Sequence, residues 1–475
     1  MHCSCRCAVP FLAFAACLGI LVNLQADDEP KSAADKKPAE AGQATQGSAV
    51  KPKPLSDSIK HGLAYLVSQQ HKDGGWGQGG GWRQGAQGGR VEGANVEDPS
   101  DVADTCIATL ALLRAGSTPT KGEYANNIAN ALEFICSHVE KADSDSLYVT
   151  NVRNTQVQGK IGPYVDTFLA GLVLAEVKGS KAEGPIAKRV DAAMGKTIAK
   201  IEKNQKADGT FAGNDGWATV FSQGLASKCL NCASQNGAVV SQAALGKAEM
   251  NAVASLDMKT RSFATGAGGM AGAGAASPVA FAGVSTRGRA GGSGLAAKAA
   301  PAALAGSASD AGVALYNISN QTQALQQAAN TNLKGQAEAK KILADAKAPA
   351  AAKDKAQSDL ARFDKIEEAR QVAVEATVKN LNDASFLQGF GSNGGEEFLS
   401  YLNISETLVV KGDKDWLAWD KKMADNLGRV QNKDGSWSGD HCITGRTFCS
   451  ATALLVLMAD RTPTPVATKL HEAKK

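Results

Sequence analysis

Three stretches of the sequence share one pattern: a glutamine, two variable positions, Asp-Gly, one further position and an aromatic residue. They are Gln70-His71-Lys72-Asp73-Gly74-Gly75-Trp76, Gln205-Lys206-Ala207-Asp208-Gly209-Thr210-Phe211 and Gln431-Asn432-Lys433-Asp434-Gly435-Ser436-Trp437. Asp-Gly favours a turn because glycine reaches positive φ without steric cost, and a glutamine amide can bond backbone groups freed at a helix end. The pattern therefore predicts a structural helix stop, and its key residues are Gln70, Gly74, Trp76, Gln205, Gly209, Phe211, Gln431, Gly435 and Trp437.

A helix is expected on each side of these turns. An apolar residue lies four positions before each glutamine, as on one face of a helix that ends at the turn. A degenerate copy at 134–138 indicates a repeat of roughly 67 residues. The second helices are apolar on all sides, which is typical of buried helices, and are expected at 101–115, 162–177, 216–230 and 446–459. The sequence thus predicts an all-α fold in which inner helices are ringed by outer ones, an α/α toroid.

The repeat resembles the QW motif of the prenyltransferase and squalene–hopene cyclase superfamily. The resemblance covers about 55–240 and 385–460. It implies a toroid of helical hairpins. It implies no single activity, because binding modules, cyclases and some polysaccharide lyases share toroids of this kind.

Composition agrees with a helical protein and excludes some classes. Glycine accounts for 50 of 475 residues and aromatic residues for only 5%, so a large core must pack small side chains, and a β-sandwich is disfavoured. The 51 basic and 47 acidic residues leave a net charge of +4. Because Lys and Arg are scattered along the chain, no nucleic-acid footprint is present.

The N-terminal residues are typical of an export signal. A basic start, an apolar run over 8–22 and a small residue at Ala26 predict a signal peptide at 1–26, hence a secreted or periplasmic protein. A membrane anchor would need about 20 apolar residues, and the protein is not expected to be an integral membrane protein after signal cleavage. Cys17 is a poorer candidate for a lipoprotein site, because Phe14 stands where an aliphatic residue is usual. Residues 27–54 are expected to form a flexible tether.

An interruption separates the third turn from the last. The first part of the toroid is expected at 55–256 and the last part at 385–462, followed by a charged tail at 463–475. Between the two parts, the Gly/Ala-rich residues 257–312 predict a disordered loop. Residues 313–384 predict an inserted helical hairpin broken near Ala348-Pro349. The hairpin is either an appendage or a coiled-coil face for a protein partner.

Six cysteines remain after signal cleavage, and two interpretations are open. They are either disulfide-bonded, as export permits, or buried free thiols on helices. They are Cys106, Cys136, Cys229, Cys232, Cys442 and Cys449.

The chemistry of the two enzyme branches is matched only in part. Cyclases of this superfamily protonate their substrate with the middle acid of Asp-x-Asp-Asp, but in Asp101-Val102-Ala103-Asp104 that position is alanine. Protein prenyltransferases bind zinc with Asp-x-Cys and a later histidine. Asp440, His441 and Cys442 are weak metal candidates, because no histidine follows on a core helix. No cofactor is predicted.

Polar residues near the starts of the apolar helices are the remaining candidates. Two interpretations are open. The residues either cap their helices and form an internal ion pair that holds the ring closed, or, if the helices are parallel, they converge on a pocket at one end, where Arg446 would be the partner of the buried acids. The candidates are Asp104, Asp166, Tyr164, Glu396, Glu397, Tyr401 and Arg446. The sequence favours a non-catalytic toroid that binds a protein or a hydrophobic or sugar ligand. The alternatives are an isoprenoid enzyme, or a polysaccharide lyase or hydrolase with Trp76, Trp82, Trp416 and Trp419 as sugar platforms.

Overall fold

The structure of the protein is a computed structural model, and the described residues are mostly helical. It describes residues 46–82, 90–91, 97–181, 183–216, 218–263, 305–383, 386, 394–439 and 442–465. These include thirteen α-helices and three two-stranded sheets. The all-α prediction is therefore confirmed. The predicted signal, at 1–26, lies outside the described residues.

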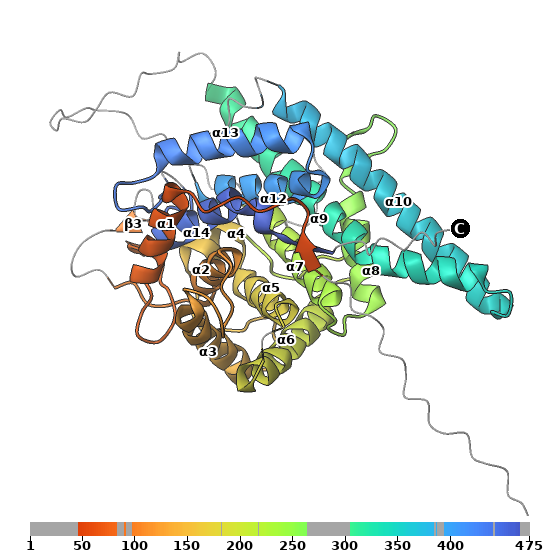
Figure 1. Ribbon diagram of the computed structural model, residues 1–475, viewed down its shortest axis with the longest axis horizontal. Helices are drawn as coiled ribbons and strands as arrows, with labels where there is room; N and C mark the ends of the chain where they lie inside the picture. The colour runs from red at the N-terminus through yellow and green to blue at the C-terminus, as the bar shows by residue number, and fades with distance from the viewer. Residues whose placement is uncertain are drawn as a thin grey trace, which may run out of the picture. The chain divides into compact units, whose positions relative to one another are not determined.

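Six helices contact one another in a closed cycle, which we call the inner ring (Figure 1). Each packs against the next, and the last packs against the first. In order they are α2 (Val102–Arg114), α5 (Val165–Gly179), α7 (Thr219–Gln235), α9 (Ala305–Ala344), α12 (Gly395–Lys411) and α14 (Arg446–Leu457). In α2, α5 and α14 nearly every residue is buried, as the sequence predicted for helices that are apolar on all sides. Nearly every residue of α12 is buried as well, although the sequence did not predict this for that helix.

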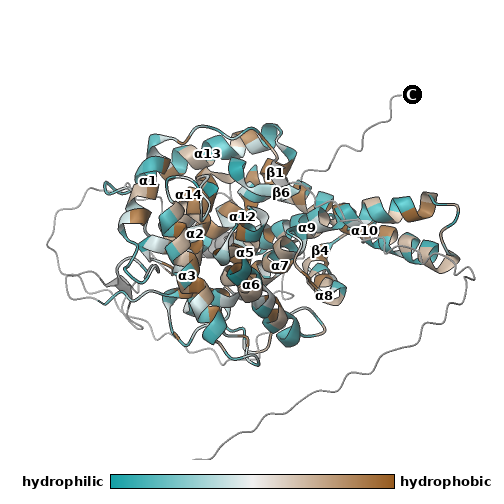
Figure 2. Ribbon diagram, turned by 60° about the horizontal axis from the view of Figure 1, so that its bottom comes forward, coloured by the Kyte–Doolittle hydropathy of each residue, from teal (hydrophilic) through white to brown (hydrophobic). Residues whose placement is uncertain are grey.

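Amphipathic helices cover the inner ring. In α3, for example, Ile128, Leu132, Ile135 and Val139 are buried on one face, at the spacing of successive helical turns. The other covering helices also bury part of their surface, and Figure 2 shows brown hydrophobic residues mixed with teal hydrophilic ones along them. The set is α1 (Asp57–Ser68), α3 (Ala125–Lys141), α6 (Pro185–Asn204), α8 (Gln242–Val253), α10 (Ala350–Leu381) and α13 (Lys414–Val430). A short helix, α4 (Gln156–Ile161), precedes α5.

The three Asp-Gly turns have one geometry, as the pattern predicted. Gly74, Gly209 and Gly435 all have φ between 82° and 88°. Each turn abuts the next covering helix so closely that a Cβ on the glycine would lie 2.4–2.5 Å from a backbone carbonyl oxygen there. The indole nitrogens of Trp76 and Trp437 donate back to the helix before the turn, at 2.7 and 2.9 Å. The turn therefore fixes both the end of one helix and its contact with the next.

Both ends of the described chain meet in a small sheet. Strand β1 (Gln46–Ser48) pairs antiparallel with β6 (Pro463–Pro465). Lys53 extends this contact, because its backbone N–H donates to Asp460 at 2.6 Å and its ammonium pairs with Asp420 at 2.5 Å. The tether prediction is therefore wrong for 46–48, and the tail prediction is wrong for 463–465, because these two segments pair as strands. The other pairs are β2 (Gly81–Trp82) with β3 (Arg90–Val91) and β4 (Leu256–Asp257) with β5 (Ser262–Phe263).

The predicted hairpin exists, but half of it belongs to the core. The helices α9 and α10 pack together and break at Pro349, as expected. However, α9 also packs against α7 and α12, so the hairpin is not a mere appendage. Besides Ile318 and Leu325, α9 buries the polar residues Ser319, Asn320 and Gln323. Because these residues are polar, the sequence pattern did not indicate that this part of α9 lies in the core. The predicted loop at 257–312 is helical from 305 on, and 264–304 lie outside the described residues.

Across the ranges that the structure describes, no helix combines the length and apolar character needed to cross a bilayer.

Candidate functional site

Asp166 links three helices at the starts of the inner helices. Its Oδ1 accepts a hydrogen bond from the backbone N–H of Ala103 on α2 at 3.1 Å, and its Oδ2 accepts from the Gln158 side chain on α4 at 2.7 Å. Burial raises the pKa of Asp166 to about 6, and the bond from Gln158 opposes this rise. The geometry is that of a structural staple between helices.

Asp101 and Asp104 lie together at the start of α2. Asp101 caps the helix, because its Oδ1 accepts from the backbone N–H of Asp104 at 2.9 Å. Burial, with the nearby charge of Asp166, raises the pKa of Asp101 to about 7. Burial and the neighbouring Asp101 raise the pKa of Asp104 well above its usual range. These acids therefore hold protons at a pH where exposed carboxyls are ionised.

Gln156 connects α4 to the loop before α14. Its Nε2 donates to the Cys442 carbonyl at 2.6 Å, and its Oε1 accepts from the Thr444 N–H at 3.0 Å. On the same loop, the Ile443 N–H donates to Glu396 Oε2 at 3.2 Å. Sequence reasoning missed Gln156, because a glutamine in a short polar segment gives no signal of burial.

The other predicted pocket residues do not join this cluster. The Tyr401 hydroxyl donates to Glu397, and its ring meets Trp419 of α13 edge-on at 5.9 Å, which places this pair toward a covering helix. Tyr164 donates to the Ala212 carbonyl at 2.9 Å. Arg446 forms an ion pair with Asp434 in the preceding turn, at 2.9 Å, and within the described residues no ion pair joins it to the buried acids that were expected to be its partners. These residues therefore make separate contacts in different parts of the fold, and the structure does not bring them together in one pocket.

The tryptophans and the metal candidates can be placed in part. Trp76, Trp416 and Trp419 are at most 4% exposed, so they offer no stacking surface for a sugar. The side chain of Trp82, and Asp440 and His441, lie outside the described residues. Cys442 is half-buried beside Glu396, and among described residues no group of three possible metal ligands occurs.

All six cysteines of the described chain are free thiols. Cys106, Cys136, Cys229 and Cys449 are buried, whereas Cys232 and Cys442 are partly exposed. Burial raises the pKa of Cys136 and of Cys229 to about 12. The structure thus corresponds to the buried-thiol alternative, in which cysteine packs as a small apolar residue.

A second cluster, which sequence reasoning missed, crosses the interior of the inner ring. Arg114 of α2 pairs with Glu176 of α5 at 2.9 Å and reaches Glu406 of α12 at 3.9 Å. Glu406 also pairs with Lys228 of α7 and accepts from Gln323 of α9 at 3.4 Å. We call these five residues the axial cluster. Because α2 and α7 are not neighbours of α12 in the ring, these side chains meet across its interior.

The axial cluster is buried and closely surrounded. The side chains of its four charged residues are at most 9% exposed. A gap beside it, lined by Gly224, Leu225, Lys228, Asn320, Gln323, Leu399 and Asn403, is too narrow to admit a water molecule. A sequence signal for the cluster did exist: Arg114, Glu176, Lys228 and Glu406 are charged residues in the later halves of inner helices.

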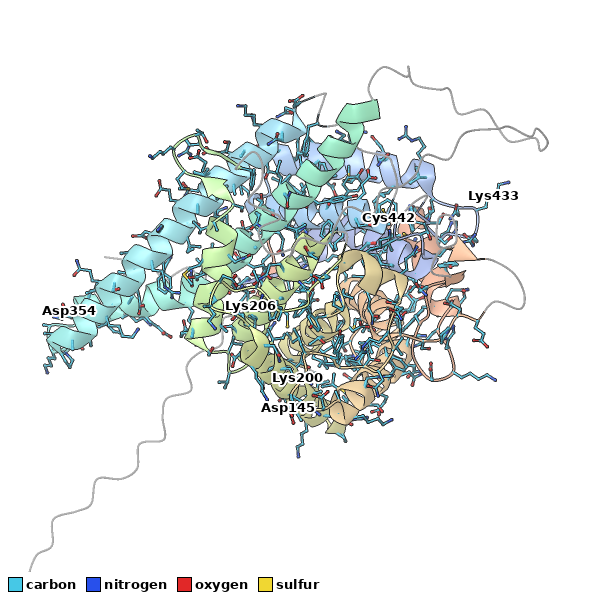
Figure 3. The ribbon with its side chains drawn as sticks, turned by 180° about the vertical axis from the view of Figure 1, so that it is seen from behind. Asp145, Lys200, Lys206, Asp354, Lys433 and Cys442 are labelled. Atoms are coloured by element: carbon cyan, nitrogen blue, oxygen red, sulfur yellow. The ribbon has the colours of Figure 1, made fainter. Side chains whose placement is uncertain are left out.

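The far half of the α9–α10 hairpin, residues 333–365, forms what we call the hairpin arm. Phe363 packs on Gly335 at its base, and Ala339 and Ala356 are buried between its two helices. In Figure 3, Asp354 lies at the end of the arm, far from Lys433 and Cys442. The arm is held by the packing between its two helices and, at its base, by the ion pair of Arg362 with Glu249 of α8 at 2.8 Å. From there it projects away from the other helices of the inner ring.

A comparison of the chain with family models, curated proteins and solved structures finds no match.

Proposed function

We propose that the chain is a divergent, exported member of the QW-repeat superfamily, folded as an α/α toroid of six hairpins. The closed cycle of inner-helix contacts supports this architecture. So does the recurring turn, in which Gln70 and Gln431 each donate to the carbonyl of their own motif glycine at 2.8 Å and to the next covering helix at 2.9 Å. Export rests on the signal pattern of the first 26 residues.

Within this family the proposed role is that of a non-catalytic binding scaffold. The observation that carries the proposal is the axial cluster, because charged side chains pair across the space in which an isoprenoid enzyme would need an apolar cavity. The acids at the other end serve as backbone acceptors between helices, as Asp166 does for Ala103. Both sets of residues act to hold the ring together.

The hairpin arm is the proposed contact element. One half of the hairpin packs into the ring, which gives the arm a rigid base, and the other half is left for contacts outside the ring. A surface carried by rigid helices loses little conformational entropy on binding.

The test replaces 337–361 with a short Gly-Ser loop, which leaves the packing of Phe363 on Gly335 in place. We expect the ring to keep its melting temperature within a few degrees. A photo-crosslinking residue at Leu343 should capture a binding partner in the native cell, and the same residue at Lys433 should not. The proposal is overturned if both sites capture partners equally, or if the chain converts an isoprenoid or a polysaccharide and loses that activity in Asp104→Asn.

A further inference from the structure

The end of the hairpin arm concentrates positive charge. Residues 340–355, which we call the arm tip, contain five lysines and two aspartates, Asp345 and Asp354, and neither arginine nor an aromatic residue. The lysines are Lys340, Lys341, Lys347, Lys353 and Lys355. The net charge of this short segment is +3, whereas the net charge of the whole chain is only +4.

Most of this charge is not neutralised within the chain. Lys340, Lys341, Lys347 and Lys355 are exposed, and Lys353 is half-exposed. Of the five, Lys355 alone has a carboxylate of the described chain within ion-pair distance, that of Asp359 at 2.8 Å. Asp345 is engaged locally, because its Oδ1 accepts from the Lys347 backbone N–H at 2.9 Å.

Two aliphatic residues lie within this basic segment. Ile342 and Leu343, in the last turn of α9, are each 37% exposed, although both side chains are large and apolar. They stand directly beside Lys340 and Lys341. The arm tip therefore carries partly exposed aliphatic side chains among exposed lysines, at the projecting end of the molecule, where Figure 3 places Asp354.

We propose that the arm tip docks onto the surface of an anionic phospholipid bilayer. Lysines beside aliphatic residues suit such a surface, because the ammonium groups attract anionic headgroups while the aliphatic groups enter the headgroup boundary. A protein partner is less favoured, because protein interfaces are depleted in lysine and enriched in arginine and aromatic residues, which the tip lacks. This inference rests on the proposed role of the arm and names the partner of that element.

The experiment measures partition of the full chain onto vesicles of phosphatidylcholine with and without 30% phosphatidylglycerol. Any contribution of residues 1–45 is then common to all variants. Lys340→Gln with Lys341→Gln should weaken binding to the anionic vesicles roughly 30-fold. Ile342→Ser with Leu343→Ser should weaken it roughly tenfold, also at high salt, because the lost contribution is apolar.

The matched control is Lys206→Gln with Lys433→Gln, which removes the same charge from exposed turns far from the arm tip. It should leave partition within twofold. The inference is overturned if the control matches the tip variant, if phosphatidylcholine vesicles bind equally well, or if polyglutamate binds the tip while vesicles do not. In the last case, crosslinking at Leu343 would still support the arm as the contact element. If neither vesicle binding nor crosslinking at Leu343 were observed, the proposed function would be overturned as well.

Discussion

The side chain of Gln431, just after α13, donates to the carbonyl oxygen of Ser58 in the first turn of α1 at 2.9 Å, across almost the whole described chain. Gln70 makes the same bond to Asn127 of α3, at the same distance. The last turn therefore contacts α1 in the same way as the first turn contacts α3. The bond that joins successive repeats thus also joins the last repeat to the first.

Gly435→Ala tests this closure. The backbone has φ of 88°, and an added Cβ would lie 2.5 Å from the His61 carbonyl oxygen, so we expect a loss of roughly 1–3 kcal/mol in the free energy of unfolding. Gly428→Ala is the control, because that helical position has open space and alanine should be neutral or stabilising. Urea unfolding of both variants measures the difference, and equal values would contradict the role of the turn.

Glu406→Gln tests the axial cluster. It leaves Lys228 and Arg114 buried without their shared carboxylate, which costs about 3–5 kcal/mol in comparable buried pairs. Replacing Lys228 with Met and Glu406 with Leu together should recover most of that loss, because no charge of the pair then remains unpaired. Lys421→Met, which removes an exposed ion pair with Asp425, should change stability by less than about 1 kcal/mol. A double variant as unstable as the single one would argue against the pairing.

Stability should fall as the pH rises from about 4 to about 7. The native state raises the pKa of Asp101 to about 7 and of Asp166 to about 6, so over this window it binds protons that the unfolded chain has released. Each such group contributes a slope of up to about 1.4 kcal/mol per pH unit. Urea unfolding at several pH values measures the slope. It should be smaller in Asp104→Asn, which removes one buried acid, and an unchanged slope would count against a protonated cluster.

Alkylation should distinguish the six described cysteines. The thiolate is the reactive form, so burial that raises the thiol pKa also protects the side chain. Cys442, partly exposed and with a pKa raised to about 11, should react before Cys136 and Cys229, whose pKa is raised to about 12. Peptide mapping after brief treatment with iodoacetamide gives the order, and a disulfide between any two of the six would refute it.

The sequence predicted those parts of the fold that depend on residues close together in the chain. The turns and four of the inner helices follow from residue spacing alone, because a helix stop and an all-apolar helix are set by neighbours in the chain. The place of α9 in the ring could not be predicted, because Asn320 and Gln323 are polar residues buried through hydrogen bonds to α12, and hydrophobic periodicity gives no signal for such contacts. The ion pair of Arg446 with Asp434, in the adjacent turn, was also not predicted, because the sequence pattern indicated only the buried acids as its partners.

The pairing of β1 with β6 has a topological consequence. Gln46 and Pro465 are direct partners across an antiparallel pair, so their Cα atoms lie roughly 5 Å apart. A linker of a few residues could join them, and new termini could be opened in the exposed turn between α9 and α10 at 345–349. Such a circular permutant would keep every helix of the inner ring intact, and both of its new termini would lie at the arm tip.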